Sequence, residues 1–390
     1  MNTTERFLKY VTFDTQSDEG SDTCPSTSKQ LIFADYLAGQ LAEIGIEDAF
    51  RDANGYVYGH IPASAGCENA PVIGLISHMD TSPDVSGKNV KPRIITYDGS
   101  NAPMTDSKYI GKPLIVSDRT TLLGADDKAG IAEIISACER VISDSNLKHG
   151  GISICFTPDE EIGRGSDNFD HKRFAADFAY TVDGGELGNI DNENFNAAGV
   201  TVKTAGVNTH PGSAKNKMRN ALLYLNEFVS MLPAEQAPGN TEGAEGFYHL
   251  TDMSGDVSSA EAHLLIRDFD SKSFEERKRL VCRIGEFLNQ KYGERTVLVD
   301  VEDSYYNMND IISDHPEILE RAQMAFRKVG IEPVMSSIRG GTDGARLSFE
   351  GLPCPNLSTG GMNFHSIYEA VSVEALEKMT DVLVEIVLAE

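Results

Sequence analysis

The first half of this 390-residue sequence alternates short apolar runs with segments of helical periodicity, and that alternation constrains the fold most. Apolar runs at 55–61, 71–77, 151–157 and 178–182 predict strands. Apolar residues recur at three- and four-residue steps over 26–44, before the first of these runs, and over 128–143, between the second and the third, which predicts helices. Such alternation is typical of βαβ units. We therefore expect an α/β fold with a mostly parallel sheet and flanking helices.

The order of predicted elements changes near residue 196. It becomes β-α-β-β-α-β, the ferredoxin-like arrangement, with elements at 199–205, 217–232, 246–252, 259–267, 273–291 and 296–303. After residue 307 the α/β pattern returns and ends in an amphipathic helix over 372–389, which Ser372 is expected to cap. We therefore predict one discontinuous domain, 1–195 and 307–390, interrupted by an inserted ferredoxin-like α+β domain, 196–306.

Charge and cysteine usage exclude several classes of function. The sequence has 34 Lys and Arg against 60 Asp and Glu, a net charge of −26, which disfavours binding to nucleic acid or to anionic membranes. It shows neither the apolar core of a signal peptide nor an apolar stretch long enough to span a bilayer, so we expect a cytoplasmic protein. Its six cysteines form no CxxC pair, so neither a thiolate zinc site nor a disulfide framework is indicated.

Acids and histidines gather just after the predicted strands. Taken singly, each has an ordinary structural interpretation, such as a helix cap or a solvated turn. Together they indicate a site, because open α/β sheets build their sites beyond the carboxyl ends of the strands. These residues are His78, Asp126, Glu160 with Glu161, Asp183 and His365. Asp80 follows His78 by two residues and is placed to accept a hydrogen bond from the imidazole.

Convergence of these residues predicts a metal centre. Four carboxylates in one cleft would raise one another's pKa values unless cations were present. Two imidazoles together with Asp126, Glu161 and Asp183 suit two Zn²⁺ ions per subunit, with Mn²⁺ or Co²⁺ as alternatives. Glu160 is then left over as the general base.

Six segments resemble the family of co-catalytic dizinc aminopeptidases and aminoacylases: SHMDTSPD, LLGADDKAG, TPDEEIGRG, TVDGGELG, VNTHPGSAK and GGMNFHSIYE. The resemblance runs from the first helix to the last and implies release of the N-terminal residue from short peptides with a free N-terminus, tripeptides in particular. It further implies that His78 and Asp183 hold one zinc, that Glu161 and His365 hold the other, and that Asp126 bridges them. Asp80 would orient His78, and the Asp126–Asp127 peptide would be cis.

The resemblance also implies a role for His210 of the inserted domain, and further candidates for substrate binding lie in that domain and at Arg339. His210 would stabilise the oxyanion, in relatives often across a dimer interface, so we expect a homodimer; the alternative is a solvated turn histidine. Arg267 and Arg339 are candidates for gripping the far carboxylate of a tripeptide, although Arg267 could instead pair with Asp268 or Asp270. Asn208 is a candidate for binding the substrate backbone.

One segment departs from the family pattern, and other functions compete. Residues 92–117 match the family poorly, so the rim of the pocket is not predicted. A dipeptidase or an N-acyl-amino-acid deacylase would use the same two metals and the same base. A noncatalytic binding protein of this fold is disfavoured, because Glu160 and every expected metal ligand are present.

Overall fold

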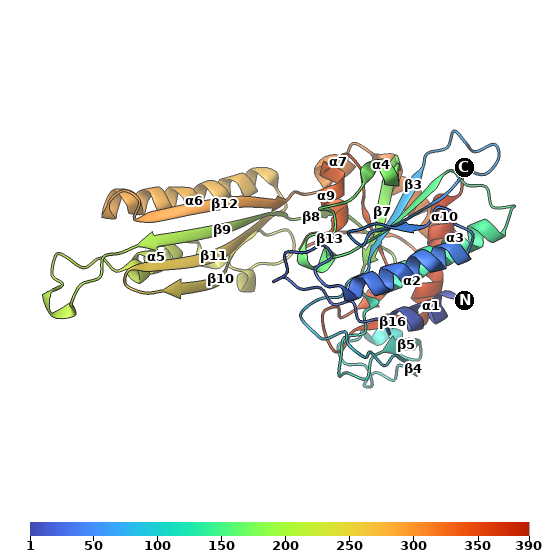
Figure 1. The fold of residues 1–390 in the computed structure, drawn as a ribbon, viewed down its shortest axis with the longest axis horizontal. Coiled ribbons are helices and arrows are strands. Elements are labelled where there is room, and N and C mark those ends of the chain that lie inside the picture. Colours follow the sequence, from blue (N-terminus) through green and yellow to red (C-terminus); the bar gives the residue numbers. More distant parts are fainter. Residues whose placement is uncertain (390) are drawn as a thin grey trace. The chain divides into compact units, whose positions relative to one another are not determined.

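A computed structural model describes residues 1–389, which divide into two compact units (Figure 1). Unit 1 comprises Met1–Asn192, Met308–Ser337 and the segment from Thr342 onward. Unit 2 comprises Glu193–Asn307 and Ile338–Gly341. Each unit has its own hydrophobic core.

The main sheet of unit 1 has eight strands in the order β1-β2-β6-β3-β7-β14-β8-β13. Their bounds are β1 Phe50–Arg51, β2 Val57–Ile61, β3 Ile73–His78, β6 Ile152–Thr157, β7 Phe178–Gly184, β8 Asn189–Asn194, β13 Val334–Ile338 and β14 Asn356–Ser358. The centre is parallel, since β3 pairs in parallel with β6 and β7, and β14 with β7. Pairings toward the edges are antiparallel: β1 with β2, β2 with β6, and β14 with β8.

The prediction of a mostly parallel sheet was therefore wrong, because the sheet is mixed. Two features of the chain explain the difference. Strands β1 and β2 are joined by a tight turn that only antiparallel strands can share. Strand β8 was not predicted, because the polar stretch Asn189–Asn194 lacks the apolar run that reveals a buried strand.

Side chains of the central strands alternate between two cores, as the two-residue period of a strand requires. Ile73 and Leu75 of β3 enter the larger core, whereas Ile76 enters the smaller one. Helices α3 and α10 belong to the larger core, while α4 and α9 pack on the strands beside the smaller one. The helices of unit 1 are α1 Thr3–Tyr10, α2 Lys29–Glu43, α3 Ala125–Ser143, α4 His171–Phe174, α7 Asn309–Ile312, α8 Pro316–Lys328, α9 Asp343–Phe349 and α10 Val373–Val387.

A second, antiparallel sheet of unit 1 was not predicted. Its order is β15-β16-β5-β4, with β4 Arg93–Thr96, β5 Pro113–Val116, β15 Gly361–Met362 and β16 Ala370–Ser372. Two of these strands come from the segment 92–117, which matched the family pattern poorly. Strand β16 also ends at Ser372, which occupies the cap position of α10 but makes no side-chain capping bond. The expected serine cap is therefore absent.

Unit 2 is a four-stranded antiparallel sheet with two helices (Figure 1). Strand order is β10-β11-β9-β12, and the chain visits β9 Asn196–Ala205, α5 Ala221–Ser230, β10 Phe247–Gly255, β11 Ser259–Asp268, α6 Ser271–Tyr292 and β12 Val297–Tyr305 in turn. Both helices pack on the sheet and against each other. Strand β10 lies at one edge and is exposed along most of its length.

Within residues 1–389, the helices include none whose length and apolar character would let it reach across a lipid bilayer.

Candidate metal centre

The carboxyl ends of three neighbouring strands deliver the first part of the site. Strand β3 ends at His78, β7 carries Asp183 near its end, and β6 runs into the turn that holds Glu160 and Glu161. Because β3 is parallel to both β6 and β7, these residues all leave the sheet at the same edge. The structure thus places them together as predicted from strand ends.

Asp126 lies at the start of α3 and faces two histidines at once. Its Oδ1 is 2.8 Å from Nε2 of His78, and its Oδ2 is 3.4 Å from Nε2 of His365. The peptide bond between Asp126 and Asp127 is cis, as the family resemblance implied, and the backbone of both residues is non-helical. The two oxygens of Asp126 therefore point at two separate imidazoles.

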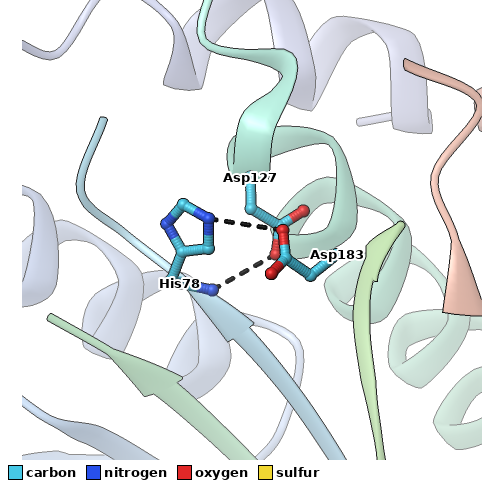
Figure 2. Close-up of side chains that lie close together, drawn as sticks. All are labelled: His78, Asp127 and Asp183. Carbon is cyan, nitrogen blue, oxygen red and sulfur yellow. Dashed lines mark hydrogen bonds and ion pairs between the residues drawn. The ribbon is translucent and has the colours of Figure 1, made fainter. Parts of the chain in front are cut away.

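A second carboxylate accompanies each histidine. Oδ1 of Asp183 is 3.3 Å from Nε2 of His78, and Oε2 of Glu161 is 2.8 Å from Nε2 of His365. Figure 2 shows the first of these groups, where the carboxylates of Asp183 and Asp127 point toward His78. The site is thus two histidine–carboxylate pairs with Asp126 between them.

The electrostatics of these residues suit bound cations. Burial, reinforced by the neighbouring Asp126, raises the pKa of Glu161 to about 8. Burial likewise raises the pKa of Asp183 to about 7. Glu161 Oε1 is buried and has no hydrogen-bond partner within the described chain. Ligand atoms of His78, Asp126 and Glu161 lie within 4.8 Å of one another, as do those of His78, Asp127 and Asp183. Such convergence of imidazole and carboxylate groups fits divalent metal ions.

Asp80 supports both His78 and the neighbouring turn. The His78 ring lies with Nδ1 3.1 Å from the backbone oxygen of Asp80 and 3.4 Å from its carboxylate. The two carboxylate oxygens accept the backbone N–H groups of Glu160 at 3.0 Å and of Glu161 at 3.2 Å. Asp80 is fully buried. A single carboxylate therefore ties the His78 strand to the turn that carries Glu160.

Two further acids hold this turn from other sides. Asp159 is buried and accepts hydrogen bonds from the backbone and hydroxyl of Ser26, at 2.6 and 2.5 Å, and from Gln30 at 2.6 Å. Asp343 accepts a bond from Thr157 at 2.9 Å. Burial and then the nearby Asp183 charge raise the pKa of Glu160 well above its usual value. Glu160 is thus a proton-accepting carboxyl on a firmly held turn.

Sequence reasoning did not assign roles to Asp127 and Lys128. Asp127 is fully buried and accepts bonds from the hydroxyl of Ser77 and from the backbone N–H of His78, the latter at 3.2 Å. The Lys128 amine is also buried and donates to the carbonyl of Phe13 at 2.8 Å. Burial lowers the pKa of Lys128 to about 7. The adjacent acids in ADDK were the signal that a second aspartate would lie beside the first.

Two other acids near the site were also missed. The Asp84 carboxylate is 3.3 Å from Nδ1 of His365. Glu369 is buried and accepts three backbone N–H groups from the segment that leads into α3. Asp84 lies within the quoted motif SHMDTSPD, which offered a signal. Glu369 likewise lies within a quoted motif, GGMNFHSIYE, although its hydrogen-bond partners are some 245 residues away in the sequence.

The four residues expected to bind substrate all lie in unit 2. Asn208 and His210 are exposed, and Nδ1 of His210 accepts a bond from the N–H of Gly212 at 3.1 Å. The guanidinium of Arg267 lies over the ring of Tyr305, 5.3 Å from its centroid. The expected alternative partner, Asp268, instead pairs with Arg277 at 2.6 Å.

Arg339 is engaged within unit 2. Its guanidinium donates to the carbonyl of Gly243 and lies 5.0 Å from the ring centroid of Phe195. The group therefore rests on an aromatic ring near the strand β9, with part of its donor capacity used.

Comparison with known proteins gives a consistent result. The family model described as peptidase family M20/M25/M40 matches residues 122–389. Proteins named peptidase T from Caldanaerobacter subterraneus subsp. tengcongensis and Halothermothrix orenii are 53% and 50% identical to the chain, covering 98% of it and 97% of each relative.

Solved structures agree on the fold. The aminopeptidase PepT of Bacillus cereus superposes with a TM-score of 0.80 at 24% identity, over 99% of this chain and 97% of that one. A dinuclear metal-binding peptidase of the M20 family from Bacillus subtilis gives a TM-score of 0.68 at 15% identity, over 99% and 96% of the two chains.

Proposed function

The chain belongs to the M20/M25/M40 family of peptidases, and from that premise we propose that it is a metal-dependent aminopeptidase that removes the N-terminal residue from tripeptides. One observation carries the proposal. The two oxygens of Asp126 face two different histidines, each with a carboxylate beside it. This arrangement suits a pair of divalent ions that share one aspartate.

His78 and Asp183 would hold one Zn²⁺, Glu161 and His365 would hold the other, and Asp126 would bridge them; Mn²⁺ or Co²⁺ would also suit these ligands. When bound, such a pair of ions polarises a peptide carbonyl and makes a nearby water molecule more acidic. Asp80 orients His78 and holds the turn that carries Glu160. The protein residues thereby set where the substrate carbonyl and the attacking water meet.

Glu160 is the proposed general base. Its carboxylate takes a proton from the attacking water as the new C–O bond forms. It then delivers that proton to the leaving nitrogen as the C–N bond breaks. Its raised pKa, which follows from burial and the nearby Asp183 charge, makes it a better proton acceptor than an exposed glutamate.

Unit 2 is the proposed ferredoxin-like lid and dimerisation domain, corresponding to 196–306, while 1–195 and 307–390 form the catalytic domain. The element order and the strand order β10-β11-β9-β12 support the ferredoxin-like assignment. Strand β10 supports a homodimer, since an exposed edge strand is a ready surface for pairing with a second copy.

Substrate contacts are proposed for four residues of unit 2. His210 would stabilise the oxyanion of the partner subunit's substrate, for which its exposed position in a tight turn leaves Nε2 available. Arg267 and Arg339 would bind the far carboxylate of the tripeptide, and Asn208 its backbone. In Arg339, the contact with the Phe195 ring would hold the guanidinium in place for a carboxylate.

A cytoplasmic location is also proposed. All six cysteines are free within residues 1–389, which is typical of proteins from reducing compartments.

The rates for free Ala-Ala-Ala and for its N-acetylated form test the function. An aminopeptidase should lose most of its rate when the α-amine is blocked, whereas an N-acyl-amino-acid deacylase should prefer the blocked form. A panel of di-, tri- and tetra-alanine then separates a tripeptidase from a dipeptidase. Treatment with a chelator should abolish turnover, and added Zn²⁺, Mn²⁺ or Co²⁺ should restore it. Faster cleavage of the acetylated peptide would overturn the proposal.

A further inference from the structure

Glu369 reaches the segment that carries Asp126 from far along the chain. The residue is 2% exposed and lies four positions after His365. Its Oε2 accepts the backbone N–H groups of Leu123 and Gly124, both at 2.7 Å, and its Oε1 accepts that of Asp126 at 3.0 Å. Both oxygens of one buried carboxylate therefore hold three backbone N–H groups of the segment 123–126.

The start of α3 explains why such an acceptor is needed. A helix leaves its first backbone N–H groups without partners, and a Ser, Thr, Asp or Asn side chain usually accepts them. Here the cap position is Gly124, in a left-handed conformation with φ of 84° and no side chain to offer. Asp126 and Asp127, two and three positions further on, are themselves non-helical. Without Glu369, buried N–H groups beside Asp126 would lack acceptors.

We propose that Glu369 is a positioning residue that sets the direction of the Asp126 carboxylate relative to both histidines. The inference rests on the proposed function only in that Asp126 is taken as a metal ligand. Glu369 and His365 lie in one short segment. The three hydrogen bonds that Glu369 accepts, called the Glu369 clamp below, therefore also fix the spacing between the segment of His365 and that of Asp126. Shifting the Asp126 backbone would turn its two oxygens away from Nε2 of His78 and of His365.

Binding of Co²⁺ alone to the full-length chain, first stripped with a chelator, tests this role. In Glu369→Gln, one oxygen becomes an NH₂ group that faces backbone donors, so the clamp is broken at nearly constant size. We expect about 10–100-fold weaker Co²⁺ binding, the usual cost of losing a group that orients a metal ligand. The visible absorption of bound Co²⁺ should also change.

Asp52→Asn is the matched control. Asp52 is half-buried and likewise accepts two backbone N–H groups, those of Asn54 and Tyr56 at 2.9 Å, but belongs to the β1–β2 turn. The Asp52→Asn substitution should lower the melting temperature without changing the affinity for Co²⁺. If Glu369→Gln lowers the melting temperature but keeps the original Co²⁺ affinity and spectrum, the role is merely structural and the proposal is overturned.

Two further results keep the test decisive. If Glu369→Gln does not fold, Glu369→Asp is titrated instead; its shorter carboxylate cannot reach all three N–H groups, so weaker Co²⁺ binding supports the proposal and unchanged binding refutes it. A chain that binds two Co²⁺ ions in a Glu369-dependent way, yet fails to cleave Ala-Ala-Ala, would refute the proposed function while leaving this inference intact.

Discussion

The two histidines of the site stand in contrasting surroundings. The His78 side chain is 2% exposed and lies against the fully buried Asp80. The His365 side chain is 43% exposed, and its carboxylate partner, Asp84, is 66% exposed. The His78 imidazole is therefore built into the edge of the sheet, whereas the His365 imidazole is open to solvent, although its other carboxylate partner, Glu161, is only 4% exposed. The difference teaches that rigidity and access are divided between the His78 half and the His365 half of the site, with Asp126 joining them.

The largest effect is expected at Glu160, whose turn is held by the buried half through Asp80. Glu160→Ala should lower kcat by about 10²–10⁴-fold, the usual contribution of a general base. Metal content should stay the same, because Glu160 is not one of the expected ligands. Steady-state kinetics and metal analysis on one preparation check this. Retained turnover would show that the buried half does not carry the base.

Replacing each histidine by alanine tests the contrast directly. In the chelator-treated protein, His78→Ala leaves buried carboxylates without their partner and should lower the free energy of unfolding by about 3 kcal/mol. His365→Ala also leaves a buried carboxylate without its partner, since the Glu161 side chain is 4% exposed, but the imidazole itself is 43% exposed, so the loss should be smaller, about 1–2 kcal/mol. Chemical denaturation measures both. Equal losses would mean that the two halves do not differ in the way their burial indicates.

The carboxylates that face Nδ1 of each histidine, Asp80 and Asp84, test the same contrast through smaller changes in Co²⁺ affinity. Asp80→Asn should weaken Co²⁺ binding by about 10–100-fold, because a buried orienting group is lost. Asp84→Asn should change it by only about twofold, since an exposed substitution is usually worth within about 0.5 kcal/mol. Calorimetric titration of both variants with Co²⁺ gives the ratio of their dissociation constants. A larger effect at Asp84 would reverse the assignment of rigid and open halves.

The smallest expected effect is a change with pH in the melting temperature of the chelator-treated protein. Asp183 and Glu161 have pKa values raised to about 7 and about 8 from 3.8 and 4.5. Between pH 5 and 7 the folded chain therefore holds protons that the unfolded chain has released, so a rise in pH favours unfolding. The melting temperature should fall by at least about 2 °C over this range.

Bound Co²⁺ should reduce this slope, because the cations favour the ionised carboxylates of the folded chain. Calorimetry at several pH values, with and without Co²⁺, measures the difference. A melting temperature that rises between pH 5 and 7 in the chelator-treated protein would contradict the burial of these acids.

The part of the site that sequence reasoning recovered depends on strand ends. Apolar runs reveal buried strands, and parallel strands leave the sheet at one edge, so His78, Asp183 and the Glu160 turn could be expected to meet. Asp126 was recovered through its place at the start of a helix. The roles of the unit 2 residues stay predictions, because their partners are substrate and a second chain.

The features that were not predicted, among them the second sheet of unit 1 and the role of Glu369, left no periodic pattern in the sequence. Strands β4 and β5 are four residues each, too short to show a clear alternation, and their sheet is completed by residues from the far end of the chain. Glu369 binds backbone N–H groups, which every residue except proline provides, so no side-chain pattern betrays its partners. The mixed pairing of the main sheet was hidden because β8 is a polar stretch without the apolar run that reveals a buried strand.

The bond from Lys128 to the carbonyl of Phe13 has a practical consequence for protein engineering. A chain shortened to begin after Phe13 would leave the buried amine of Lys128, two residues from Asp126, without its hydrogen-bond acceptor. It would also lack α1 with its buried Arg6 and Phe7. The first thirteen residues therefore support the segment that carries Asp126 and Lys128. An affinity handle joined there should be separated from Met1 by a flexible spacer, and a truncation series should spare this stretch.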